Sequence, residues 1–503
     1  MPQPGDSPSP TGSTAGSTAG STATATPPAA PPGGDDYLER RTLRRGTAGW
    51  LLLTGLGVAY VVSGDYSGWN FGLREGGFGG LAIATALMGL MYTCLVFSLA
   101  EMSSVLPTAG GGYGFARRAL GPWGGFLTGT AILIEYVLAP AAIATFIGAY
   151  VESLNLFGLT SGWPVFLACF VIFIGVHLWG VGEALRFSFV VTAVAVLALV
   201  VFAVGALGSF DASRLNDIKV TDAVGAGSWL PFGLMGIWAA FPFGMWFFLG
   251  VEGVPLAAEE TKDPVKSLPR AMALSIGILV VLAVITLLPT VGAGGANALK
   301  ESGNPLVEAL RTANGGKSSA LSQIVNYAGL AGLVASFFSL IYAGSRQLFA
   351  LSRAGYLPRF LSLTSKRKAP YLGLVVPGTI GFVLAAANAD DGSKVLNMAV
   401  FGAAVSYVLM ALSHIVLRLR EPALHRPYRT PGGIVTSAVA FVLAVAAVVA
   451  TFLVDIDAAL TALAVYAVAI GYFALYSRKR LVASAPEEEF AALAAAEAEL
   501  ARD

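Results

Sequence analysis

The stretch VVSGDYSGWN, residues 61–70, ends the first long apolar segment of the chain and places a carboxylate among glycines. Asp65 stands between Gly64 and Gly68, and glycine weakens a helix because it has no side chain to restrict its backbone. Backbone that leaves the helical conformation at membrane depth is tolerated only where protein or a water-filled cavity satisfies its polar groups. The stretch therefore predicts an interrupted helix that lines a cavity, with an acid at the interruption.

The composition indicates a protein built mainly of membrane-spanning helices. Of its 503 residues, 55% are hydrophobic and 12% are charged, whereas a soluble domain carries about 25% charged residues. Apolar segments of roughly 20 residues recur, and each can cross a bilayer core of about 30 Å as a helix. We expect an all-α integral membrane protein with twelve transmembrane helices, at residues 47–73, 79–106, 122–152, 163–182, 187–210, 230–260, 269–291, 321–345, 371–388, 395–417, 432–454 and 458–476.

The distribution of positive charge predicts the orientation, because Lys and Arg concentrate in the cytoplasmic loops of membrane proteins. With the N-terminus inside, seven of the 31 Lys and Arg residues fall on the outer side, which leaves 24 on the inner side. We therefore expect both termini to be cytoplasmic, in a multi-pass protein of the cell membrane. The seven outer residues are Arg74, Arg214, Lys219, Lys300, Arg311, Lys317 and Lys394.

The terminal segments, the net charge, the cysteines and the histidines exclude several classes of function. Residues 1–46 are rich in small residues and lack the apolar core of a signal peptide, so we expect a disordered cytoplasmic tail. Residues 477–503 are expected to form a second cytoplasmic tail. A net charge of +1 offers no basic surface to nucleic acid. Cys94 and Cys169 lie in apolar segments and are expected to be free thiols. No metal site or cofactor is expected, because the histidines are far apart in the chain: His177, His414 and His425.

A second interruption, FFLGVEGVP, falls at residues 247–255, where Gly250 and Gly253 flank Glu252. It lies five spans after the first, in a helix of the opposite direction, which suggests two five-helix repeats of inverted topology. Broken helices at corresponding positions are the best sequence indication of a transporter's binding site. The expected units are the repeats at 47–210 and 230–417, which together form a core at 47–417, and two added helices at 432–476.

Four motifs resemble the amino acid–polyamine–organocation transporters and follow that superfamily's order. They are FSLAEMSSVLPTAGGGYGFARRALGPWGGFLTG (97–129), FFLGVEGVPLAAEETKDPVKSLPRA (247–271), YAGSRQLFALSRAGYLPRFL (342–361) and LRLREPALHRPYRTPGG (417–433). SGDYSGWNFGLREGGFGGLAIATALMGLMY and IEYVLAP further resemble the ethanolamine permease branch. The resemblance implies a LeuT-like fold with discontinuous helices 1 and 6. It also implies alternating access, in which helices 1, 2, 6 and 7 rock against the rest, and uptake of a small amine.

Asp65 favours a substrate that is a cation without a carboxylate. A zwitterionic amino acid places its carboxylate on the exposed amides of a broken helix in transporters of this architecture. An acid among those amides repels that carboxylate and attracts an ammonium group. Ethanolamine is such a substrate, since simple amines titrate near 10. Burying an acid near the bilayer centre costs about 2.5–3.5 kcal/mol, so a role is expected, and the alternative role is that of a helix cap.

Further candidates surround the two interruptions. Glu252 either braces the second break or contacts the substrate. Glu135, an isolated charge in the third span, is a second amine ligand, a proton carrier or a neutral hydrogen-bonded acid. By resemblance, Trp246 lies where the superfamily places an aromatic lid, and aromatic rings at such a site attract a cation; Trp69 is a further ring beside the first break. The predicted substrate-binding residues are Ser63, Gly64, Asp65, Tyr66, Gly68, Glu135, Trp246, Phe247, Gly250 and Glu252.

The sequence is compatible with more than one coupling ion and more than one class of function. Candidate proton-coupling residues are Asp65, Glu135 and His177, although His177 is better explained as a hydrogen-bond partner of a neighbouring helix. Sodium would require ligands such as Ser336 and Ser339 between spans 1 and 8. The alternatives to an amine importer are a zwitterionic amino acid carrier with Asp65 turned away, and an amine-sensing receptor. A membrane enzyme is not expected, because the spans contain no nucleophile–base pair.

Overall fold

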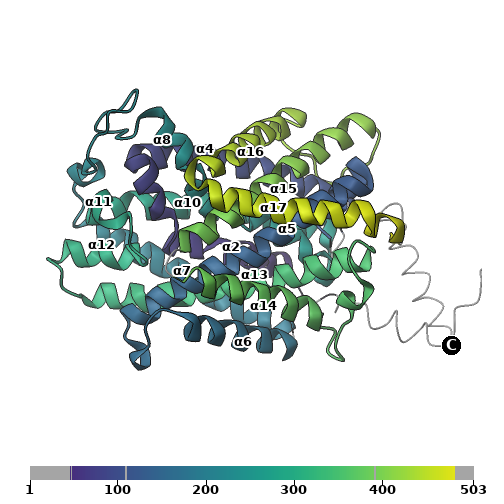
Figure 1. Cartoon of the computed structure of the whole chain (residues 1–503), viewed down its shortest axis with the longest axis horizontal. Helices are drawn as coiled ribbons and strands as arrows, with labels where there is room; N and C mark the ends of the chain where they lie inside the picture. Colours follow the sequence, from purple (N-terminus) through teal and green to yellow (C-terminus); the bar gives the residue numbers. More distant parts are fainter. Residues whose placement is uncertain (1–45, 47, 108–109, 180, 390–391, 482–503) are drawn as a thin grey trace, which may run out of the picture.

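The architecture is a bundle of long helices that run side by side along the long axis of the molecule (Figure 1). A computed structural model describes residues 46, 48–107, 110–179, 181–389 and 392–481. Within these residues the regular elements are all helices, and one isolated bridge pairs Ala48 with Thr261. The predicted all-α membrane fold is confirmed.

The twelve predicted spans can all be traced in the described part of the chain. Nine helices there are long and apolar enough to cross a membrane. Two shorter apolar helices are α6 (Trp163–Trp179) and α14 (Tyr371–Ala387), and the first span is split into α2 (Trp50–Val61) and α3 (Ser63–Tyr66). The sixth span consists of α8 (Gly233–Ala239), α9 (Phe241–Trp246) and the 3-10 helix η4 (Val251–Glu260).

The remaining long helices are α4 (Gly72–Val105), α5 (Gly112–Ser153), α7 (Val181–Leu207), α10 (Pro264–Gly294), α13 (Ala320–Arg353), α15 (Gly392–Arg420), α16 (Ile434–Val454) and α17 (Ile456–Leu475). The short elements are η1 (Trp69–Phe71), η2 (Leu156–Gly158), η3 (Ala212–Asn216), α11 (Ala296–Leu299), α12 (Pro305–Ala313), η5 (Arg359–Ser362) and η6 (Ser477–Arg480).

Two glycines fix where the second and third spans begin. Gly77 in α4 has φ 66° and Gly121 in α5 has φ 77°, so each interrupts its helix in a conformation that favours glycine. The expected spans at 79–106 and 122–152 start directly after these bends. The short helical segments before the bends are continuous with the spans in the chain but differ from them in direction.

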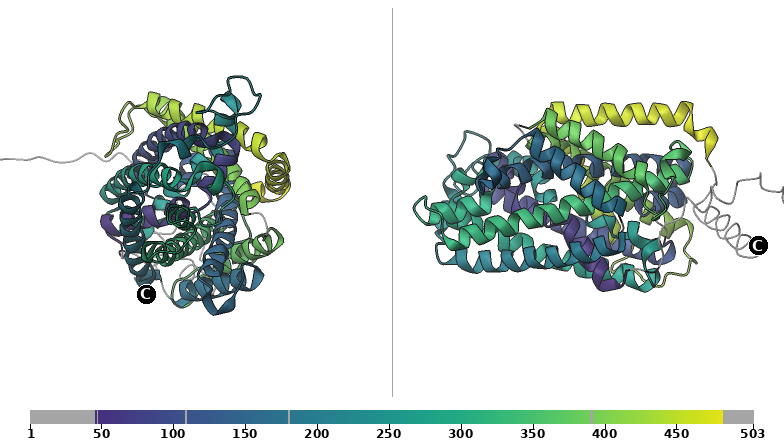
Figure 2. Two further views of the ribbon diagram at one scale, coloured as in Figure 1. Left: turned by 90° about the vertical axis from the view of Figure 1, so that its left-hand side faces the viewer. Right: turned by 90° about the horizontal axis from the view of Figure 1, so that it is seen from below.

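The last two helices lie outside the bundle. α16 packs against α15 and α4, and α17 packs against α15 and α5. Only 28% of the most apolar part of α17 is buried, against 83% for α5. Figure 2 shows α17, in yellow, along one edge of the bundle. The site described below is therefore built from the first ten spans.

A further difference from the predicted spans is at α13, which was expected to end at residue 345 and continues to Arg353. The hydropathy of the sequence falls there because Arg346 and Gln347 are polar, yet both side chains are fully buried. Arg346 pairs with Glu260 of η4, and the Gln347 side-chain amide donates to the Gly129 carbonyl of α5, so the helix continues inside the protein. The division into two repeats stays a prediction, and the expected tails lie outside the described residues except for Gly46 and residues 477–481.

A buried ion pair closes the predicted cytoplasmic end of the bundle. The Arg346 guanidinium on α13 lies 2.8 Å from Glu260 at the end of η4, and both side chains are at most 1% exposed. The Tyr342 hydroxyl donates to the same carboxylate at 2.9 Å. The backbone of Ala48 bonds to that of Glu260 and of Lys262, which attaches the start of the first span to the end of the sixth.

Removing Arg346 is expected to destabilise the protein strongly. Arg346→Ala leaves the Glu260 carboxylate buried without its cation, which costs about 3–5 kcal/mol. Lys266→Ala is the matched control, because Lys266 is 71% exposed and lies 3.9 Å from Asp263; its effect should stay within about 0.5 kcal/mol. The measurement is unfolding of the two purified variants in detergent. Equal stabilities would contradict a structural role for the Arg346–Glu260 pair.

Candidate functional site

The two helix interruptions touch each other inside the bundle. A Cβ atom added at Gly64 would collide with the Trp246 carbonyl oxygen, so the two backbones approach as closely as glycine permits. The Trp246 indole N–H donates to the Ser67 carbonyl at 2.9 Å. The rings of Trp69 and Phe247 stack with centroids 5.5 Å apart. The breaks predicted separately from residues 61–70 and 247–255 therefore form one structure.

The first break is held by a serine of the eighth span. The Ser336 hydroxyl donates to the Ala59 carbonyl at 2.6 Å and accepts from the Ser63 amide at 2.9 Å. It thereby partners two backbone groups on either side of the turn at Val62. The break ends at Gly68, whose φ of 96° favours glycine. Ser336, considered above as a sodium ligand, thus already bridges the interrupted backbone.

Asp65 is buried at this break without a partner for its charge. Its side chain is 1% exposed, and neither carboxylate oxygen has a hydrogen-bond partner among the described residues. A neighbouring polar group is the Thr286 hydroxyl of α10, which lies beside the carboxylate but outside strict hydrogen-bond geometry. The side chain caps neither α3 nor η1, since neither helix has a side-chain cap. In this structure the carboxylate thus does not serve as the helix cap considered above.

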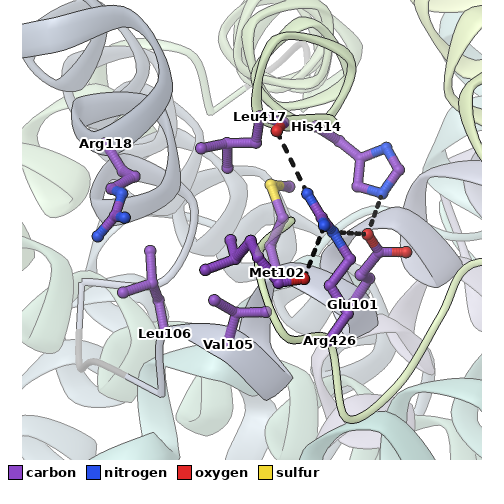
Figure 3. A pocket seen from close by; sticks show the side chains of 9 residues that line it. Glu101, Met102, Val105, Leu106, Arg118, His414, Leu417 and Arg426 are labelled. Atoms are coloured by element: carbon purple, nitrogen blue, oxygen red, sulfur yellow. Dashed lines mark hydrogen bonds and ion pairs between the residues drawn. The ribbon is translucent and has the colours of Figure 1, made fainter. Parts of the chain in front are cut away.

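Glu101 on α4 shows the opposite arrangement for a buried acid. Its carboxylate accepts from the Arg418 and Arg426 guanidinium groups at 2.9 Å each and from the Thr430 amide at 2.7 Å, and His414 lies 3.3 Å away. Figure 3 shows His414 and Arg426 directed at Glu101 from two sides. A buried acid in this protein can therefore be fully paired, which makes the isolation of Asp65 specific to its position.

Glu252 of the second break is supplied with hydrogen bonds. The Tyr136 hydroxyl donates to one carboxylate oxygen and the Tyr407 hydroxyl to the other, both at 2.9 Å. The Gly250 amide also donates to this carboxylate, at 3.2 Å. Gly250 itself has φ 103°, so the glycine and the acid together shape the break. The bracing role expected for Glu252 is one that this geometry can perform.

Glu135 on α5 lies beside Glu252. Its side chain is fully buried, and one oxygen lies 3.4 Å from the Tyr407 hydroxyl. The same hydroxyl lies 2.9 Å from Glu252, so the two carboxyl groups are neighbours that one proton can join. Glu135 therefore faces the second break across the interface between α5, η4 and α15.

Aromatic rings enclose the first break, but Tyr66 points away from it. Trp246 packs edge-on against Phe146 with centroids 6.1 Å apart. The Tyr66 hydroxyl instead donates to the Ala195 carbonyl of α7 at 2.7 Å, and the Tyr150 hydroxyl donates to the Tyr66 carbonyl at 3.0 Å. Of the predicted aromatic residues, Trp69, Trp246 and Phe247 lie at the break, while the Tyr66 side chain connects α3 to α7.

The predicted outer end is closed over Asp65 by the segment that contains α11 and α12. The Ser67 hydroxyl donates to the Gly303 carbonyl at 2.8 Å. The Asn70 side-chain amide donates to the backbone carbonyls of Leu299 and Ser302 at 2.7 and 2.9 Å. Since the Arg346–Glu260 pair closes the other end, the carboxylate of Asp65 is occluded from both sides.

The other proposed coupling residues are engaged elsewhere. His177 on α6 is bonded to the Phe338 carbonyl at 2.9 Å and its ring stacks on Phe338, as expected of a partner to a neighbouring helix. The Ser339 hydroxyl is paired with that of Ser188 at 3.0 Å. Among the described residues, no group of three or more His, Cys, Asp or Glu is placed to hold a metal ion.

Several residues of the site were not predicted from the sequence. They all lie within long apolar helices: Tyr92 on α4, Tyr136 and Phe146 on α5, Thr286 on α10 and Tyr407 on α15. A hydroxyl or a ring within an apolar segment gives no signal of its own. Tyr136 follows Glu135 directly in the chain, which was the single local indication available.

Comparison with known proteins agrees with this architecture. The family model described as Amino acid permease matches residues 52–483. An uncharacterized transporter of Rhizobium meliloti is 30% identical over 404 residues, covering 79% of this chain and 85% of its own. A methylthioribose transporter and a branched-chain amino acid permease of Bacillus subtilis are each 27% identical, covering 70% of this chain and 76% and 77% of their own.

The contact between the two breaks makes Gly64 a sensitive position. In Gly64→Ala the new methyl group collides with the Trp246 carbonyl, so we expect a loss of about 1–3 kcal/mol in stability. Gly277→Ala on α10 is the control, because a Cβ atom there has no neighbour within 4 Å; it should be neutral or stabilising by up to about 1 kcal/mol. Thermal unfolding in detergent distinguishes them, and a Gly64→Ala protein as stable as the control would refute the close approach.

Proposed function

The chain belongs to the amino acid permease family, and from this membership and the isolated carboxylate of Asp65 we propose that it imports ethanolamine or a similar small cationic amine. As a member of that family it is a multi-pass membrane transporter of a small molecule and not an enzyme. We place it in the cell membrane with both termini cytoplasmic, as its distribution of Lys and Arg predicts.

The observation that carries the proposal is the missing partner of Asp65. Glu101 and Glu260 are buried acids that bind Arg side chains, whereas both oxygens of Asp65 lack a partner among the described residues. An isolated buried charge is costly. An ammonium group bound at the carboxylate would remove that cost. The ring faces at Trp69, Trp246 and Phe247 would add to the attraction for a cation.

The close contact of the breaks favours a small substrate. Neither Gly64 nor Gly68 leaves room for a methyl group, because backbone or side-chain atoms of Trp246 lie against both. A two-carbon amine fits such a site better than a long diamine does. The hydroxyl of ethanolamine would have Thr286 as a nearby partner, whose own hydroxyl donates to no group among the described residues.

An amino acid is the second candidate substrate, because one relative is a branched-chain amino acid permease. Its carboxylate would need free backbone amides. At the first break, however, the amides of Asp65 and Ser67 bond to backbone carbonyls, that of Ser63 to Ser336, and that of Gly68 to the Asn70 side chain at 3.2 Å. The amide of Gly250 at the second break bonds to Glu252. With these amides engaged and an anion beside them, a substrate carboxylate is disfavoured.

Alternating access is the mode of transport that we propose. α10 packs against α2, α4 and η4, which supports one moving body made of helices 1, 2, 6 and 7. The substrate would be released when the contacts at Glu260 and Arg346 separate. Sodium symport, facilitated diffusion and exchange are the alternatives to proton symport. The experiment below distinguishes a transporter from an amine-sensing receptor.

Uptake by the purified protein in liposomes tests the substrate. We expect saturable entry of radiolabelled ethanolamine that unlabelled ethanolamine competes and that alanine, serine and leucine do not. Asp65→Asn removes one partner of a buried ion pair, a loss of at least about 2 kcal/mol, so the rate at low substrate should fall about 30-fold or more, since 1.4 kcal/mol is tenfold.

Asp457→Asn, an exposed acid at the start of α17, is the matched control and should transport normally. Entry of an amino acid in place of ethanolamine, with Asp65→Asn unimpaired, would overturn the substrate assignment and leave the fold intact. Tight binding of ethanolamine without any entry would indicate the receptor instead.

A further inference from the structure

A pair of acids separate from Asp65 lies between the second break and the third span. Glu135 on α5 and Glu252 on η4 are 0% and 4% exposed. The titratable groups that face them are the hydroxyls of Tyr60, Tyr92, Tyr136 and Tyr407, from α2, α4, α5 and α15. Neither acid forms an ion pair with a basic residue of the described chain. The cluster therefore has no positive charge to balance two carboxylates.

The hydrogen-bond donors of the cluster are directed at Glu252. Its two oxygens accept from Tyr136, from Tyr407 and from the Gly250 amide. Tyr92 donates to the Tyr407 oxygen at 3.1 Å. A hydroxyl carries one proton, and that of Tyr407 lies 2.9 Å from Glu252 but 3.4 Å from Glu135. Glu252 thus has the surroundings of a carboxylate, which only accepts hydrogen bonds.

Glu135 has the surroundings of a carboxylic acid. Its second oxygen has no hydrogen-bond partner if both acids are ionised, whereas a proton on Glu135 can be donated to Glu252 beside it. Two neighbouring negative charges in a low-dielectric interior repel each other strongly, and carboxyl groups paired in this way share one proton. Repulsion thus requires one proton on the pair, and the hydrogen-bond pattern places it on Glu135.

We propose that Glu135, paired with Glu252, carries the proton that moves with the substrate in each transport cycle. This inference rests on the proposed function as an importer and names its coupling ion. The two acids belong to parts that are expected to move relative to each other, because Glu252 lies on η4 of the sixth span, while Glu135 and Tyr407 lie on α5 and α15. Opening at the cytoplasmic end would separate the pair and admit water.

Separation of the two acids lowers the proton affinity of Glu135. In contact, the pair must keep one proton; in water, each acid can ionise at neutral pH. Glu135 would therefore release its proton to the cytoplasm together with the amine and bind another from the outside before the next cycle. One ammonium ion and one proton enter per cycle, so an acidic exterior would drive accumulation.

Glu135→Gln tests the proposal because the amide imitates the protonated acid but cannot release a proton. In proteoliposomes with an acidic exterior, the native protein should accumulate labelled ethanolamine severalfold above the level reached without a gradient. The variant should lose this stimulation and keep counterflow, in which labelled ethanolamine exchanges for unlabelled ethanolamine at equal pH. Glu152→Gln, an exposed acid on the same helix, is the control and should keep both activities.

A Glu135→Gln protein that still responds fully to the proton gradient would overturn the inference. If the variant does not transport at all, infrared spectroscopy of the purified proteins decides the matter. The native protein should show the absorption of a protonated carboxylic acid, and the variant should have lost it; a spectrum unchanged by the substitution contradicts the assignment. Should the native protein fail to transport ethanolamine, the proposed function fails, while the infrared comparison still reports on the pair.

Discussion

Every backbone N–H and C=O that leaves a helix inside the membrane must find a partner in the protein or in a water-filled cavity, and the arrangement of the core follows from this constraint. Two spans are interrupted, and side chains of the protein bond to the freed backbone groups at each interruption. Ser336 bonds to both sides of the first break, and Trp246 of the sixth span bonds to the Ser67 carbonyl. At the second break the Glu252 carboxylate accepts from the Gly250 amide. The first break thus depends on the sixth and eighth spans, and the second depends on an acid of its own span that Tyr136 and Tyr407 hold in place.

The five buried acids of the described chain differ in how their charge is balanced, and the roles that we propose for them follow these differences. Glu101 and Glu260 bind arginines, and they attach helix ends to one another. Glu252 is surrounded by hydroxyls and an amide, and Glu135 by a single distant hydroxyl. Asp65 has no partner among the described residues. The acids without a compensating cation lie at or beside the two breaks, where we propose that the substrate and the proton bind.

The sequence predicted the membrane fold well because its signals are local. Apolar length defined the spans, and the glycines at 64, 68 and 250 marked the breaks. It failed where a polar residue is buried by a partner distant in the chain. The end of α13 was placed eight residues too early, because the sequence around Arg346 does not indicate that Glu260 pairs with it. For the same reason Tyr407, which bonds to both Glu135 and Glu252, could not be assigned to the site.

The sequence by itself determined that the chain crosses the membrane repeatedly, where its helices are interrupted and that an acid lies at the first interruption. Hydrophobicity and backbone freedom are properties of a residue and its neighbours, so they can be read along the chain. The tertiary structure decided which acids are paired and which are not. Pairing depends on the distance between side chains from different helices, and that distance is set only when the bundle packs. It left Asp65 isolated and placed Glu135 against Glu252, and on these two outcomes the proposals for substrate and proton depend.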